Sequence, residues 1–138
     1  MAVQLSDYPT MAELEDFFGH DRFAEHIGCK IVEGSVGHGV AELTIEDHHR
    51  NALGIVMGGA IFTLADFALA IASNVGVEPS VSINSSIDYY SASKGSKLIA
   101  TCNVDKGGRR LGFYTTDITD DEGKRIARMT TTVFRNPA

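Results

Sequence analysis

One segment of the chain is apolar on every side, and it constrains the fold more than any other feature. After Gly58-Gly59, the run AIFTLADFALAIA holds 11 apolar residues out of 13. A helix that lacks a polar face is normally buried all round. Asn74 and Gly76 then supply signals that end a helix. The pattern predicts a central helix over residues 58–75, covered on all sides by the rest of the protein.

The segments around this helix change to a period of two, which is typical of half-buried strands. Apolar and polar residues alternate from Ala41 to Glu46, and a turn between Gly34 and Gly37 pairs this strand with Cys29–Glu33. At the N-terminal side, Met11–Phe18 predicts a short amphipathic helix and Phe23–Ile27 a lead-in turn. Four further strands are expected at residues 80–90, 97–106, 109–119 and 124–135, separated by the turn-rich segments SASKGS, KGG and DDEG.

The predicted order is therefore (α)ββαββββ, an α+β arrangement in which an antiparallel sheet wraps around one central apolar helix. A ferredoxin-like fold would need a second comparable helix, which the pattern does not contain. The 138 residues fit a single domain spanning residues 1–138 and leave enough chain for a substantial core.

Charge and cysteine content exclude several classes of protein. The net charge of -6 argues against non-specific nucleic-acid binding, although residues 1–93 carry 3 basic and 13 acidic side chains and residues 94–138 carry 9 and 5. Cys29 and Cys102 are too few and too far apart for a disulfide framework, and we expect both to be buried in a reducing compartment. The N-terminus does not resemble a secretory signal, and the apolar stretch 60–72 is too short to span a bilayer. A cytoplasmic protein that does not bind membranes is expected.

Asp66 is the only charged residue between Asn51 and Glu78. Burial of a carboxylate is costly unless the group is paired or hydrogen-bonded, and loss of hydration raises its pKa and makes it a better base or nucleophile. A structural carboxylate that accepts backbone hydrogen bonds or faces a subunit interface is the alternative interpretation.

The residues around Asp66 favour the catalytic interpretation. Residues 49–59, HRNALGIVMGG, followed by Leu64-Ala65-Asp66, resemble the PaaI-like hotdog-fold acyl-CoA thioesterases, whose usual pattern is H-x-N-x-x-G-x-x-H-G-G-x-x-x-x-L-x-D. The resemblance continues through Ser82-Ile83-Asn84, Asp88-Tyr89-Tyr90, Lys94-Gly95, Gly108-Arg109-Arg110 and residues 125–130. It covers nearly the whole chain from about residue 20.

This resemblance implies hydrolysis of an acyl-CoA thioester, with CoA as part of the substrate and no metal or dissociable cofactor. It implies that the Gly58 amide at the helix N-terminus polarises the carbonyl and stabilises the oxyanion. Asp66 would attack the carbonyl or activate a water, Asn51 would orient water or substrate, and Ser82 would assist the hydrolytic step. Hotdog sites form between subunits, so the resemblance also implies a homodimer or homotetramer in which Asp66 faces Asn51 and Gly58 of its partner.

One position departs from the family pattern. Met57 stands where the histidine before the glycine pair is usual, and a thioether cannot donate a hydrogen bond. Met57 would then line an apolar acyl pocket, or the enzyme would be impaired. A non-catalytic acyl-CoA or acyl-carrier-binding protein is therefore a second hypothesis. A hotdog dehydratase is a third, less favoured because such enzymes usually pair a histidine with an acid.

The resemblance also assigns roles to residues outside the central motif. Tyr89 matches a position near the pantetheine arm in relatives, whereas Tyr90 is expected to pack. The basic residues Lys106, Arg109 and Arg110 beside the Gly107-Gly108 turn are expected to contact the CoA phosphates near the pocket mouth.

His48-His49 shows no metal-ligand pattern on an extended segment and is expected at the surface or in a loop. The chain has no Gly-x-Ser-x-Gly elbow and no P-loop.

Overall fold

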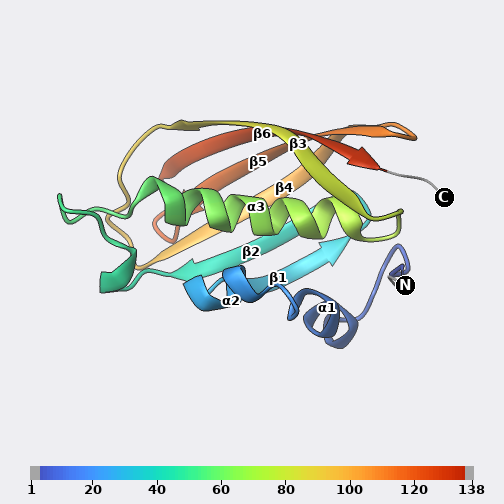
Figure 1. The fold of residues 1–138 in the computed structure, drawn as a ribbon. Helices are drawn as coiled ribbons and strands as arrows, with labels where there is room; N and C mark the ends of the chain where they lie inside the picture. The colour runs from blue at the N-terminus through green and yellow to red at the C-terminus, as the bar shows by residue number, and fades with distance from the viewer. Residues whose placement is uncertain (1–3, 136–138) are drawn as a thin grey trace.

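A six-stranded antiparallel sheet wraps around one long helix in the computed structural model, which describes residues 4–135 (Figure 1). The strand order is β1-β2-β4-β5-β6-β3, so β1 and β3 are the two edges. This α+β arrangement confirms the predicted fold class. The elements are α1 (Met11–Phe18), α2 (Arg22–Ile27), β1 (Lys30–Ser35), β2 (His38–Thr44), η1 (Asp47–His49), α3 (Gly58–Asn74), β3 (Ser80–Tyr89), β4 (Lys97–Gly107), β5 (Leu111–Asp120) and β6 (Arg125–Arg135).

Capping residues explain the one element that was predicted wrongly near the N-terminus. The segment predicted as a lead-in turn is helix α2, because the Asp21 side chain accepts a hydrogen bond from the Ala24 N–H and Gly28 ends the helix with φ +102°. Helix α1 begins as predicted, at a capping box between Thr10 and Glu13.

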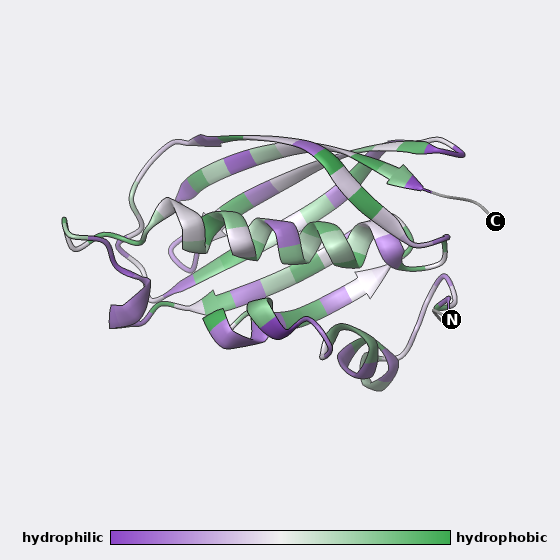
Figure 2. Cartoon of the chain, viewed as in Figure 1, coloured by the Kyte–Doolittle hydropathy of each residue, from purple (hydrophilic) through white to green (hydrophobic). Residues whose placement is uncertain are grey.

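Helix α3 packs on the inner face of the sheet and forms the centre of the core. Leu64, Ala65, Ala68 and Ile71 have no exposed surface, and Figure 2 shows the helix as largely hydrophobic or neutral. Strand β2 approaches the helix backbone closely, since a Cβ at Gly39 would lie 2.6 Å from the Ala68 carbonyl oxygen. The absence of a side chain at this position lets helix and sheet touch.

The prediction that α3 is buried all round is wrong for a single chain. Gly59 and Asp66 are exposed, and Phe62, Thr63 and Ala70 are only partly covered. The sheet covers one side of the helix and the N-terminal segment covers part of another. The remaining stripe, defined by these five residues, is only partly covered by residues 4–135.

The edge strand β3 is also unusually exposed for its composition. Val81 and Ile83 are 64% and 57% exposed, although the neighbouring Ile87 packs against the core. The pairing of β3 with β6 shifts register between Ser82 and Asn84, which interrupts the alternation expected from the sequence. An edge strand with exposed apolar side chains is a surface suited to a further strand.

Both cysteines are buried, as predicted, and neither forms a disulfide. Burial raises the pKa of each thiol, Cys29 and Cys102, to about 12, so both behave as small apolar side chains. None of the helices within residues 4–135 has the length and apolar composition needed to cross a bilayer.

Candidate active site

No side chain of the described residues caps the N-terminus of α3, and a contact with β3 fixes the position of its first residue. The N-cap residue, Met57, makes no side-chain capping hydrogen bond. Tyr89 on β3 donates its hydroxyl to the Gly58 carbonyl oxygen over 3.1 Å, and burial raises the pKa of this hydroxyl, which keeps it protonated as a donor. A Cβ at Gly58 would lie 3.1 Å from the Tyr89 ring, whereas one at Gly59 would meet nothing within 4 Å. Neither the Gly58 N–H nor the Gly59 N–H donates a hydrogen bond within residues 4–135, so the first amides of the helix are available to a ligand.

Asn51 organises the loop that leads into this helix. Its side-chain oxygen accepts hydrogen bonds from the Leu53 N–H (2.9 Å) and the Ile55 N–H (3.3 Å). The backbone N–H of Asn51 donates to the Ile55 carbonyl oxygen over 2.8 Å. The side-chain oxygen is thus occupied by the loop. The side-chain amide nitrogen has no hydrogen-bond partner among residues 4–135, so Asn51 presents a donor rather than an acceptor.

Asn51, Gly58 and Tyr89 line one cavity of about 340 Å³. Tyr90, Ser91–Ser93 and the apolar residues Ile55, Val56 and Ile61 form the rest of its wall. Tyr90 is half exposed and lies beneath the Arg125 guanidinium, which is 5.0 Å from the ring centroid. The structure thus brings together three residues that the sequence analysis had assigned to the site, from a loop, a helix N-terminus and a strand end.

Asp66 and Ser82 line a different groove, of about 240 Å³, between α3 and the start of β3. Burial among apolar neighbours raises the pKa of the Asp66 carboxyl, and the negative charge of Asp21 raises it further. The carboxylate nevertheless remains exposed to solvent within the single chain, which corrects the expectation of a fully buried acid. An accessible carboxylate with a raised pKa is suited to act as a base or nucleophile.

One chain does not bring these two groups of residues together. Gly58 and Asp66 are eight residues apart on α3, which corresponds to about 12 Å along the helix axis. Strand β3 is longer, about 30 Å for its 10 residues, and runs from Ser80 near the end of α3 to Tyr89 near Gly58. The predicted catalytic residues therefore form two half-sites: Asn51, Gly58 and Tyr89 at the start of α3, and Asp66 and Ser82 between the middle of α3 and its C-terminal end.

The basic hairpin lies on the side of the molecule where α3 ends. Lys106, Arg109 and Arg110 flank the β4–β5 turn, beside the last residue of β6, and Figure 1 shows this hairpin at the opposite end of the molecule from the start of α3. Within one chain it is therefore distant from the Gly58 half-site and on the same side as the Ser80–Ser82 segment.

A larger cavity, about 460 Å³, lies elsewhere, between α1, α2, β1 and α3. Phe18, Phe67 and Cys29 form part of its wall, and Glu15 and Asp21 contribute acidic groups. It contains none of the residues predicted for the site, so its size alone does not make it the reaction centre. The chemistry of the two half-sites is the better guide.

Comparison with known proteins decides the family. Residues 53–127 match the thioesterase superfamily, a segment that includes Gly58, Asp66, Ser82 and Tyr89. The chain belongs to the thioesterase superfamily. It is 33% identical over 102 residues to human acyl-coenzyme A thioesterase 13, with 71% of this chain and 73% of the relative covered.

Solved structures of similar proteins identify the fold as a hotdog fold. The PaaI protein of the E. coli phenylacetic acid degradation operon superposes with a TM-score of 0.86 at 25% identity, covering 92% of this chain and 93% of the other. A hypothetical thioesterase of Streptococcus pneumoniae TIGR4, solved with coenzyme A, gives a TM-score of 0.80 at 26% identity, covering 88% and 96%. The resemblance to PaaI-like thioesterases stated from the sequence is confirmed.

Met57 is the position at which this thioesterase-superfamily chain departs from the usual pattern. It is the N-cap residue of α3, and 57% of it is exposed. Its neighbours Leu53 and Ile55 are also exposed apolar residues. The loop before α3 therefore presents an apolar surface beside the Gly58 amide.

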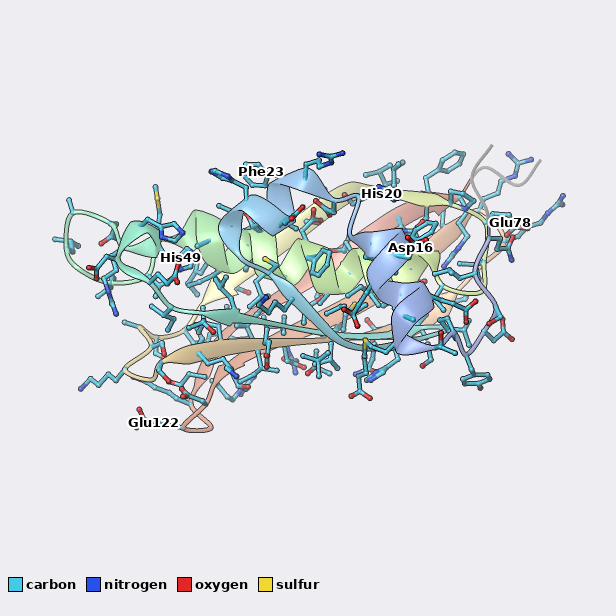
Figure 3. The ribbon with its side chains drawn as sticks, turned by 90° about the horizontal axis from the view of Figure 1, so that it is seen from below. Asp16, His20, Phe23, His49, Glu78 and Glu122 are labelled. Carbon is cyan, nitrogen blue, oxygen red and sulfur yellow. The ribbon has the colours of Figure 1, made fainter. Side chains whose placement is uncertain are left out.

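His49 is a residue of the site region that the sequence analysis misjudged. It lies in the 3-10 turn η1, not on an extended segment, and only 3% of it is exposed. Its Nδ1 accepts from the Glu46 N–H (3.0 Å) and its Nε2 donates to the Ile27 carbonyl (2.7 Å), which defines a neutral ring. Figure 3 shows His49 at the end of the molecule where α3 begins. A histidine beside polar residues gives no sequence signal for this burial.

His49 also fixes the entry to α3, because its carbonyl oxygen accepts the Met57 N–H over 2.8 Å. We expect His49→Phe to lower the free energy of unfolding by about 2–4 kcal/mol, since the ring volume is kept while two buried polar groups lose their partners. The neighbouring His48 is exposed, and His48→Phe should change stability by less than about 0.5 kcal/mol. Urea unfolding of both variants measures the difference, and equal effects would contradict the assignment.

Proposed function

We propose that this protein is an acyl-CoA thioesterase whose active site is completed by a second copy of the chain. The observation that carries the proposal is Asp66, an accessible carboxylate of raised pKa on the partly covered stripe of an otherwise apolar helix. Membership of the thioesterase superfamily and similarity to a thioesterase solved with coenzyme A support the substrate class.

The dimer follows from the separation of the half-sites. Strand β3 is an edge whose backbone groups are unpaired on one side and whose apolar side chains Val81 and Ile83 are exposed. Antiparallel pairing of β3 with its two-fold copy sets the Ser80 end of one strand opposite the Tyr89 end of the other. Asp66 then approaches Asn51 of the partner subunit and Gly58 of the partner subunit.

The outer face of the sheet supports this choice of interface. It carries polar cross-strand pairs, including Arg128 with Asp117 (2.7 Å) and Thr115 with Asp105 (2.6 Å). Groups that are already paired with each other gain little from burial against a partner. The dimer is the smallest assembly that completes the site, and a tetramer would pair two such dimers.

In the proposed reaction, the thioester carbonyl oxygen binds to the Gly58 N–H and to the Asn51 side-chain amide of one subunit. Asp66 of the other subunit removes a proton from an attacking water, or attacks the carbonyl carbon itself to form a mixed anhydride that water then hydrolyses to the free acid and the Asp66 carboxylate. Ser82 lies beside Asp66 and assists the water. A C–O bond forms, the C–S bond breaks, and a proton passes to the sulfur of CoA. Water, a base and an oxyanion donor suffice for this chemistry, so the proposal includes no metal or dissociable cofactor.

The remaining site residues are assigned to substrate binding. Met57 contacts the acyl group at the apolar loop, and Tyr89 lies along the pantetheine arm. Lys106, Arg109 and Arg110 bind the phosphates of CoA through charge-assisted hydrogen bonds. A cytoplasmic location is part of the proposal, because two free buried cysteines suit a reducing compartment.

The function is tested by offering the purified protein short, medium, long and aryl acyl-CoAs and following thiol release. We expect hydrolysis of at least one class, and Asp66→Asn should lower kcat by about 10²–10⁴, the usual contribution of a positioned base. Tight acyl-CoA binding with no release in any class would select the alternative of a non-catalytic binding protein. Full activity of the Asp66→Asn variant would exclude the mechanism.

The shared site has its own test in mixed dimers. Asp66→Asn and Asn51→Ala homodimers should each be strongly impaired, because both half-sites of every active site are needed. After dissociation and reassociation of an equimolar mixture, half the dimers are mixed and each has one intact site, so about a quarter of wild-type activity should return. A mixture no more active than its two parents would show that the site lies within one chain.

The pH dependence follows from the raised pKa of Asp66. The ionised carboxylate is the active form, so activity falls as pH drops through that raised pKa. Asp21→Asn removes a negative charge that raises the Asp66 pKa and keeps an oxygen for the α2 cap. The acid limb of the kcat/KM profile should therefore move to lower pH. Asp16→Asn, an exposed change on α1 (Figure 3), is the control and should leave the limb in place.

A further inference from the structure

A buried arginine lies under the basic hairpin. Arg135, the last residue of β6, is only 4% exposed. It has no carboxylate partner within residues 4–135, and its Nε has no hydrogen-bond partner there. Burial of a charge without a counter-charge is costly. A neutral side chain of similar length would avoid that cost, so stability of the fold alone does not account for a positive charge at position 135.

The contacts of Arg135 are with the tip of the β4–β5 hairpin. Its Nη1 donates to the Gly108 carbonyl oxygen over 3.2 Å, and its backbone N–H donates to the Arg110 carbonyl oxygen over 2.6 Å. These two carbonyls stand on either side of Arg109. One residue of β6 therefore holds both ends of the segment that carries the two exposed hairpin arginines.

The surroundings of the guanidinium are shaped to accept it. Its Nη2 donates to the hydroxyl of Tyr114, a residue that is itself buried. A Cβ at Gly112 would lie 2.6 Å from Nη1, so the glycine on β5 provides the space that the guanidinium occupies. Asp105, the acid nearest the hairpin on β4, is bonded to the Thr115 hydroxyl and not to Arg135.

We propose that Arg135 is a positioning residue for CoA binding: it holds the backbone of residues 108–110 so that Arg109 and Arg110 meet the phosphates of the substrate. The proposal rests on the proposed thioesterase function and deepens it. Arg135 does not touch the substrate. It acts through the carbonyl oxygens of Gly108 and Arg110, to which it donates hydrogen bonds.

Two thioesters of the same acyl group separate this role from a general one. An acyl-CoA carries the phosphates, whereas the acyl-N-acetylcysteamine thioester has the same reacting bond and no phosphate. For Arg135→Gln we expect KM for the acyl-CoA to rise about tenfold, the lower end of what a lost charge-assisted hydrogen bond accounts for. Its kcat and the kcat/KM for the N-acetylcysteamine thioester should stay within about twofold of wild type.

A double-mutant cycle tests whether Arg135 acts through the hairpin. In an Arg109→Ala, Arg110→Ala background, Arg135→Gln should raise KM little further, because the groups that it positions are gone. Additive effects in this cycle would overturn the proposal. So would a loss of activity toward both thioesters alike, which would indicate a purely structural role, or no change toward either.

Tyr114→Phe keeps the test valid if Arg135→Gln does not fold. It removes one hydroxyl that binds the guanidinium and leaves the ring, so it should raise KM for the acyl-CoA alone, by less than Arg135→Gln. An unchanged KM in this variant would count against the proposal. Failure of the wild-type protein to hydrolyse either thioester would instead refute the thioesterase function.

Discussion

The packing of α3 against the inner face of the sheet determines where every other element lies. Side chains such as Leu64 and Ile71 lose all contact with water there, which stabilises the fold by about 1.5–3 kcal/mol for each large apolar side chain. Close approach at Gly39 sets the distance between helix and sheet. The strands must curve around the helix to cover it, and a six-stranded sheet with two free edges covers only part of its circumference.

The incomplete cover of α3 locates the chemistry. A carboxylate at position 66 is accessible because it lies on the partly covered stripe, and its pKa is raised because the surrounding helix and sheet still remove much of its hydration. Among the described residues, the Gly58 and Gly59 amides have no acceptor, because they begin the helix and the Met57 side chain does not cap it. Both features belong to the same rigid helix, so their separation cannot change within one chain. Convergence of the two half-sites therefore requires a second copy.

The sequence predicted the features that depend on composition and spacing. The central helix, the succession of strands along the chain and the motif from His49 to Asp66 are local patterns, and the structure confirms the fold that they indicate. Other features depend on long-range contacts that no local pattern encodes. His49 is buried because Ile27, 22 residues away, offers it a carbonyl. Arg135 is buried because β5 and β6 pair at Leu111 and Phe134. The separation of Asp66 from Gly58 was implicit in helix geometry, but which groove each faces was not.

The uneven charge of the chain acquires a more specific meaning in three dimensions. Two basic residues of the C-terminal part are paired with carboxylates on the outer face of the sheet, Arg128 with Asp117 and Lys97 with Glu42. Among residues 4–135, Lys106, Arg109 and Arg110 form no ion pair, and they surround the buried Arg135. Exposed charges are screened beyond about 8 Å at physiological ionic strength, so a distant positive potential would contribute little to binding an anion. Direct contact is required, and its strength depends on where the hairpin backbone places its side chains. A buried cation that bonds to that backbone is thus better placed to control binding than another exposed lysine would be.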